Sequence, residues 1–192
     1  MSENTFLKVM FGTTSGADAN LHYKIGEVNI AKQWNSRESN PELMGGFNFS
    51  TEESIFRWLI RGNTLYDVMI PPDAEIIRVN SPSTPGSVYR SNKIVISNPR
   101  CMTDDIALEL YRKSVLPDKT YFKALAGCAI CGYYNTCKII IDERINSDII
   151  DLCLSEFADF VTPETSSFPS DGSIYYKVLD ILRKFRQKES LF

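Results

Sequence analysis

The spacing of the apolar residues changes near residue 100, and this change constrains the fold more than any other feature of the sequence. Before it, the segments 65–71 (LYDVMIP), 74–80 (AEIIRVN) and 87–97 (SVYRSNKIVIS) are rich in Val, Ile and Tyr and are bounded by turn residues, which is typical of strands. After it, apolar residues recur at helical spacing. Strands followed by helices, without regular alternation, predict an α+β fold with a mixed, mainly antiparallel sheet.

The same pattern predicts how the chain is divided. We expect a strand-rich part over 1–100 and a helical part over 101–161 that packs on it, with Thr103 capping the first helix. Further helices are expected over about 119–131, 136–144 and 148–160. The polar run 162–172 (TPETSSFPSDG) predicts a linker, and 173–192 predicts a terminal helix. The proline-containing segments 71–73 and 81–86 are expected to be turns or loops.

One helix is predicted within the strand-rich part. Ser50 and Glu53 have the spacing of a capping box. In this motif the Ser50 side chain accepts from the Glu53 amide, and the Glu53 side chain reaches back to the Ser50 amide. Apolar residues at helical spacing follow, and Gly62 stands where a left-handed C-terminal cap is expected. The pattern predicts a helix of about three turns that starts at Ser50 and packs one face on the sheet.

Charge and hydropathy exclude several classes of protein. The 192 residues include 21 basic and 24 acidic side chains, which give a net charge of −3. A nucleic-acid partner is therefore not expected, because phosphate binding needs an excess of Lys and Arg. No window approaches the 18 apolar residues of a membrane span, and the first residues do not have the apolar run of a signal peptide. We expect a cytoplasmic protein without a membrane partner.

The cysteines and the single histidine offer little chemistry. The five cysteines are an odd number, and four of them, Cys128, Cys131, Cys137 and Cys153, fall in predicted buried helix, so reduced thiols are expected. Cys128 and Cys131 have metal-ligand spacing but lie within one helix, so no metal is expected. The sequence contains no phosphate loop, dinucleotide fingerprint or nucleophile elbow. No cofactor and no complete catalytic constellation is therefore predicted.

Two segments resemble known families. The run 124–143 (ALAGCAICGYYNTCKIIIDE) resembles one ankyrin helix pair, which we place over 120–143. The runs 45–79 (GGFNFSTEESIFRWLIRGNTLYDVMIPPDAEIIRV) and 89–96 (YRSNKIVI) resemble an uncharacterised domain that precedes ankyrin repeats in proteins of giant DNA viruses. This second resemblance covers residues 44–160. It implies a viral protein that would act in the cytosol of its host.

A third resemblance is to the ADP-ribosyltransferase fold. His22 in the run LHYKIG is similar to the His or Arg on the first strand of that fold, and Phe49-Ser50-Thr51 is similar to its aromatic-Ser-Thr strand. The glutamate of the third strand would be Glu75, although the E-x-E or Q-x-E arrangement is absent. The resemblance implies an enzyme that uses NAD, with His22, Ser50 and Glu75 as its catalytic residues.

The leading hypothesis is a non-enzymatic binding module, viral or phage-like, that engages a host or phage-defence protein or a small anionic ligand. The alternative is the ADP-ribosyltransferase. The glycine turn, the predicted helix start and one strand would form the ligand surface, with residues Gly45, Gly46, Ser50, Thr51, Tyr89, Arg90 and Lys93. The segment 89–93 (YRSNK) also fits an edge strand that its charges protect from aggregation. Association into a homo-oligomer is left open.

Overall fold

The computed structural model confirms the α+β prediction and describes residues 5–14, 21–41, 43–81 and 84–189. Pro82 and Ser83 of the predicted loop, and the last three residues of the predicted terminal helix, lie outside these ranges. The chain divides into two compact units. The sheet unit comprises residues 1–55 and 61–101, and the helical unit comprises 56–60 and 102–192.

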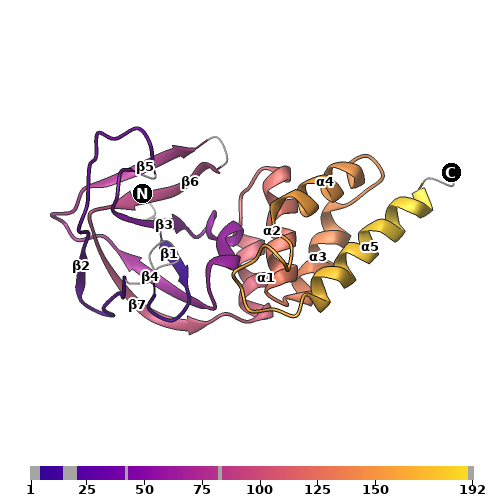
Figure 1. Ribbon diagram of the computed structural model, residues 1–192, viewed down its shortest axis with the longest axis horizontal. Coiled ribbons are helices and arrows are strands. Elements are labelled where there is room, and N and C mark those ends of the chain that lie inside the picture. Colours follow the sequence, from indigo (N-terminus) through magenta and orange to yellow (C-terminus); the bar gives the residue numbers. More distant parts are fainter. Residues whose placement is uncertain (1–4, 15–20, 42, 82–83, 190–192) are drawn as a thin grey trace. The chain divides into compact units, whose positions relative to one another are not determined.

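Seven described strands form one sheet in the order β2-β7-β4-β1-β3-β6-β5 (Figure 1). They are β1 (Phe6–Met10), β2 (Val28–Ile30), β3 (Phe47–Thr51), β4 (Thr64–Met69), β5 (Ile76–Ser81), β6 (Thr84–Ser91) and β7 (Lys93–Cys101). Every pairing between these strands is antiparallel. Only Asn92 separates β6 from β7, yet the two strands lie near opposite ends of the order. The sheet must therefore curl until its two ends meet at Asn92.

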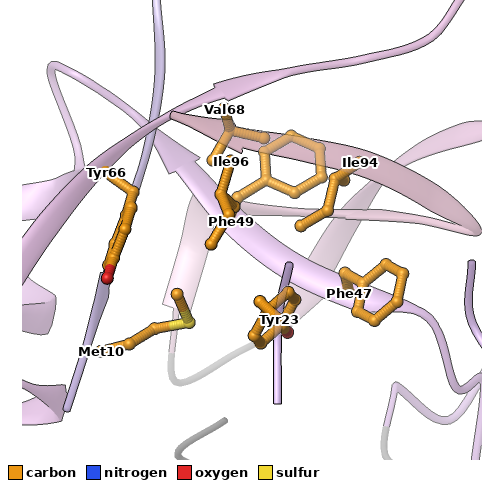
Figure 2. Close-up of a cluster of buried hydrophobic side chains, with 8 residues drawn as sticks. All are labelled: Met10, Tyr23, Phe47, Phe49, Tyr66, Val68, Ile94 and Ile96. Atoms are coloured by element: carbon orange, nitrogen blue, oxygen red, sulfur yellow. The ribbon is translucent and has the colours of Figure 1, made fainter. Parts of the chain in front are cut away.

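Period-two alternation places the core of the sheet unit on the inner face of this curl. Tyr66 and Val68 of β4 face Phe47 and Phe49 of β3, with Ile94 and Ile96 of β7 completing the cluster (Figure 2). Tyr23, from the segment before β2, packs against Phe47 with ring centroids 5.3 Å apart. Aromatic and β-branched side chains fill the space between strands that come from distant parts of the sequence.

The prediction of an α-helix that starts at Ser50 is wrong. Ser50 and Thr51 belong to β3, where they pair with Leu7 and Phe6 of β1, and the Ser50 side chain is almost completely buried. The following helical segment is a 3₁₀ helix, η1 (Ile55–Arg61). Gly62 has no left-handed conformation; a Cβ there would lie 2.0 Å from the Met10 carbonyl carbon, so this glycine permits close backbone approach. Strand pairing took precedence over the local capping signal.

The helical unit contains α1 (Asp104–Lys113), α2 (Asp118–Ile130), α3 (Tyr134–Arg144), α4 (Ile150–Phe160) and α5 (Ser173–Glu189). The Thr103 hydroxyl accepts from the Ile106 amide and caps α1 as predicted. Helix α2 is buried along most of its length and packs against α3, α4 and α5. The helices predicted within 120–143 are present as α2 and α3, and their resemblance to an ankyrin pair stays a prediction.

Candidate ligand-binding site

The Gly45-Gly46 turn is held tightly against the segment around Trp34. Both glycines have positive φ, +72° and +74°. A Cβ on Gly45 would lie 2.3 Å from the Gln33 carbonyl oxygen, and a Cβ on Gly46 would lie 2.6 Å from the Trp34 ring. The Gly46 amide donates to the same Gln33 carbonyl at 2.9 Å. Only glycine fits this turn, which supports a close backbone approach at the start of β3.

A buried lysine binds Asn48, which follows this turn by two residues. Lys8 is in the centre of β1, on the same face as Met10 and Tyr66, and only 6% of it is exposed. Its ammonium group donates to the Asn48 side-chain oxygen at 2.7 Å and to the Asn48 carbonyl, and lies 5.3 Å from the centre of the Tyr23 ring. These described partners of Lys8 are all neutral. Burial, with a smaller contribution from the Arg90 charge, lowers the pKa of Lys8 to about 7.

Arg90 binds the glycine turn and lies opposite Asn48, the residue that binds Lys8. It lies on β6, where its backbone pairs with Asn48 of β3, and its guanidinium donates from Nη1 to the Gly45 carbonyl at 2.7 Å. Asn48 is exposed and Arg90 is half-buried, whereas Lys8 is enclosed. We call Lys8, Asn48, Arg90 and Gly45 the Lys8–Arg90 cluster. The cluster therefore combines an exposed amide, a half-buried arginine and an enclosed lysine.

Glu75 and Lys93 belong to a separate set of contacts around Asn92. The Trp34 indole donates to the Glu75 carboxylate at 3.0 Å, and the Glu75 amide donates to the Asn92 side chain at 2.8 Å. Hydrogen bonds from Trp34 and Ser36 lower the pKa of Glu75. Lys93 forms an ion pair with Asp73. Glu75 is therefore an ionised, exposed acid that is held by an indole.

The three residues of the enzyme hypothesis have different surroundings. His22 is exposed, and its Nδ1 lies 3.4 Å from the Thr14 hydroxyl. Ser50 is enclosed within β3, and Glu75 binds Trp34. No described hydrogen bond joins any two of the three.

The predicted ligand residues are only partly brought together. Arg90 binds Gly45, so these two residues lie together, whereas Lys93 binds Asp73. The Tyr89 ring, which we expected to offer a stacking face, packs against Phe6 and Phe49 at centroid distances of 5.1 and 6.0 Å. A helix N-terminus at Ser50 is not available to an anion, because no helix starts there; Ser50 and Thr51 are strand residues.

The sequence did not lead us to predict Lys8 or Asn48 as ligand-binding residues. The segment 6–10 (FLKVM) carried a usable signal, since strict alternation places Lys8 on the same face as Phe6 and Met10. A lysine between apolar neighbours on one strand face predicts a buried cation that needs an oxygen partner. Asn48 could not be predicted as that partner, because β1 and β3 are separated by 36 residues of chain.

The thiols and acids supply no further candidate site. All five cysteines are free; Cys128, Cys137 and Cys153 are buried, and burial raises the pKa of Cys153 to about 12. Within the described ranges, no three His, Cys, Asp or Glu side chains are arranged to hold a metal ion.

None of the helices that the structure describes combines the length and the apolarity needed to cross a bilayer. Comparison of the chain with protein-family models, curated proteins and solved structures returned no match.

Proposed function

We propose that the sheet unit is a non-catalytic binding module for an anionic group, and that the Lys8–Arg90 cluster is its site. The observation that carries the proposal is a buried lysine beside an arginine, with neutral partners around the lysine. The anionic group belongs to a small ligand or to an acidic side chain of a host or phage-defence protein. The module acts in the cytoplasm, which is the host cytosol for a viral protein.

Electrostatics supports this choice of ligand. A buried cation loses hydration, and two neighbouring cations repel each other, so both effects oppose protonation of Lys8. A carboxylate or phosphate oxygen bound at Arg90 would offset the repulsion between Arg90 and Lys8 and favour the charged lysine. Charge-assisted hydrogen bonds to such an oxygen are about twice as strong as neutral ones. Binding of an anion should therefore be coupled to uptake of a proton by Lys8.

The arrangement also specifies how a ligand approaches. The exposed Asn48 amide and the half-buried Arg90 guanidinium form the outer part of the cluster, and Lys8 lies behind them. One guanidinium nitrogen of Arg90 donates to the Gly45 carbonyl at 2.7 Å, which restrains the position of the group. A planar guanidinium is suited to carboxylate or phosphate. We expect direct contact from Arg90 and a supporting charge from Lys8.

The test is titration with inorganic phosphate, acetate and ADP-ribose, followed by calorimetry and by NMR of ¹³C-labelled lysine side chains. We expect at least one anion to bind and to raise the pKa of Lys8. Arg90→Gln should weaken binding at least about tenfold. The matched control Arg100→Gln, which removes an exposed arginine paired with Asp67, should change it less than about twofold.

The outcomes separate the possible ligands. Binding of phosphate and ADP-ribose alone identifies a phosphate-bearing ligand, whereas binding of acetate identifies a carboxylate. If no anion shifts the Lys8 resonance, or if the two arginine variants lose affinity equally, the proposal fails. Incubation with labelled NAD tests the alternative, because transfer of label that is abolished by Glu75→Gln would establish an enzyme and remove the non-catalytic part of the proposal.

A further inference from the structure

Strand β2 is an edge strand whose outer side carries backbone groups without described partners. It pairs with β7 through Asn29 opposite Ile94, and the Ala31 amide continues this ladder to the Asn92 carbonyl at 2.9 Å. In an antiparallel ladder, alternate residues direct their N–H and C=O groups to the same neighbour. Asn29 and Ala31 thus face β7, and Val28 and Ile30 direct theirs to the open edge. Within the described residues, no strand pairs with that edge.

The side chains at this edge are apolar and exposed. Val28 is 49% and Ile30 is 67% exposed, and both lie on the sheet face opposite to the buried Asn29. The row continues inward, because Val28 is opposite Val95 of β7, which is opposite Met69 of β4, itself exposed. Native edge strands are normally protected by charges, prolines or bulges. The three residues of β2 have none of these, so the edge is suited to pairing.

The backbone of β2 is also fixed in place. The Asn29 side chain accepts from the Lys24 amide at 2.8 Å and donates to the Lys24 carbonyl at 2.9 Å and the Glu27 carbonyl at 3.1 Å. Gly26 has a φ of +77° and donates to the Ile96 carbonyl. These bonds fix the turn before β2, so the strand presents its outer edge in a defined register.

We propose that two copies of this chain associate through β2, aligned antiparallel about a two-fold axis at Asn29. Val28 of each copy is then opposite Ile30 of the other. Because both residues have outward N–H and C=O groups, this register forms four backbone hydrogen bonds across the interface. The same face of the joined sheets carries the Val28 and Ile30 side chains of both copies side by side, which is the self-complementarity that a two-fold dimer requires.

Charge complementarity selects the antiparallel alignment. Glu27, which forms an ion pair with Lys24 at 3.3 Å, precedes β2, and Lys32 follows it, so the strand has a charge-balanced end and a basic end. Two antiparallel copies place Lys32 of one at the end of the other that carries the Lys24–Glu27 pair, whereas parallel copies bring the two Lys32 side chains together. If one copy shifted by one residue along the other, the buried face of one sheet, which carries Asn29, would continue into the exposed face of the other, which carries Val28. A shift by two residues would align only Val28 or only Ile30 with itself, which leaves two hydrogen bonds instead of four.

A three-residue strand gives a small interface, so we expect a reversible dimer that is populated at high micromolar concentration. Sedimentation equilibrium on the full chain over a wide concentration range should show a monomer–dimer equilibrium. Ile30→Lys should weaken association at least about tenfold, since it places two lysines beside the two-fold axis. The matched control Val115→Lys, at a position in the helical unit that is 71% exposed, should change association less than about twofold.

Cross-linking tests the register separately. In a Cys101→Ser background, which removes the exposed native thiol, a mixture of Val28→Cys and Ile30→Cys chains should form mixed disulfides. Directly opposite residues in such a pair have Cα atoms about 5.5 Å apart, which suits a disulfide. A chain that stays monomeric at all concentrations overturns the proposal. So does a dimer that tolerates Ile30→Lys, or one in which only like cysteines cross-link.

Discussion

Asp104 belongs to α1 but caps α3, and replacing it with alanine tests how the helical unit is held together. One carboxylate oxygen accepts from the Asn135 amide at 2.8 Å. The other accepts from the Thr136 amide at 2.9 Å and from the Thr136 hydroxyl at 2.6 Å. Helix α3 has no cap of its own, because Tyr133 at its N-cap position makes no side-chain hydrogen bond to the helix. The start of α3 thus depends on a residue from another helix.

The expected loss follows from what alanine leaves behind. Removing an N-cap costs about 1 kcal/mol, and leaving the amide of the fully buried Thr136 without an acceptor adds about 1–3 kcal/mol. The Thr136 hydroxyl keeps a second acceptor, the Asp104 carbonyl at 3.0 Å, so it adds little. We therefore expect Asp104→Ala to lower the free energy of unfolding by about 2–4 kcal/mol.

Urea unfolding followed by circular dichroism at 222 nm measures this loss. The matched control is Asp105→Ala, which removes an exposed carboxylate from the same first turn of α1. Both variants lose a favourable interaction with the helix dipole, worth about 0.3–1 kcal/mol, but only Asp104→Ala loses the cap of α3. Asp104→Asn should retain part of the stability, since its amide oxygen can still accept. Equal losses in the two alanine variants would refute the capping role.

Three further predictions concern buried groups. Gly62→Ala should lower the unfolding free energy by about 3 kcal/mol or more, because its Cβ would overlap the Met10 backbone, and wild-type stability in urea would contradict this. Since the pKa of Lys8 falls from 10.5 to about 7 on folding, the unfolded chain binds more protons between these values, so the wild type should gain stability relative to Lys8→Met as pH rises from about 7 to 8.5. Tyr111→Phe should cost about 1–2 kcal/mol in urea unfolding, because the Tyr111 hydroxyl donates to Glu143 at 2.9 Å and accepts from Arg144.

The helical unit could be predicted almost completely from the sequence, because its signals are local. Thr103 caps α1 through the hydrogen bond that its position predicts, and α2 ends one residue before Cys131 and two before Gly132. A helix forms its own hydrogen bonds, so spacing and caps over a dozen residues are sufficient. The Asp104 cap was not predictable, since it joins residues that are 31 and 32 positions apart.

The sheet unit was less predictable because its signals are not local. The sequence at Ser50 satisfies a capping box, yet pairing with Leu7, more than 40 residues away, draws Ser50 into β3. The segment 87–97 was predicted as one strand, whereas the structure divides it into β6 and β7 at Asn92. There the Ser91 hydroxyl donates to the Lys93 carbonyl, and the Asn92 side chain accepts from the Glu75 amide. No alternation pattern could show such a bend.

The bend at Asn92 also determines which residues of the predicted ligand surface can act together. Arg90 stays on β6 beside β3 and binds Gly45, whereas Lys93, only three residues later, begins β7 opposite Ile30 and binds Asp73. The segment 89–93, which the sequence predicts to be one basic strand, is thus divided between two separate sets of contacts. The cation that accompanies Arg90 is instead Lys8, from the other end of the sheet unit's sequence. Anion binding should therefore depend on Arg90 and Lys8 and be insensitive to Lys93→Gln, and calorimetry that shows equal losses for Arg90→Gln and Lys93→Gln would contradict this division.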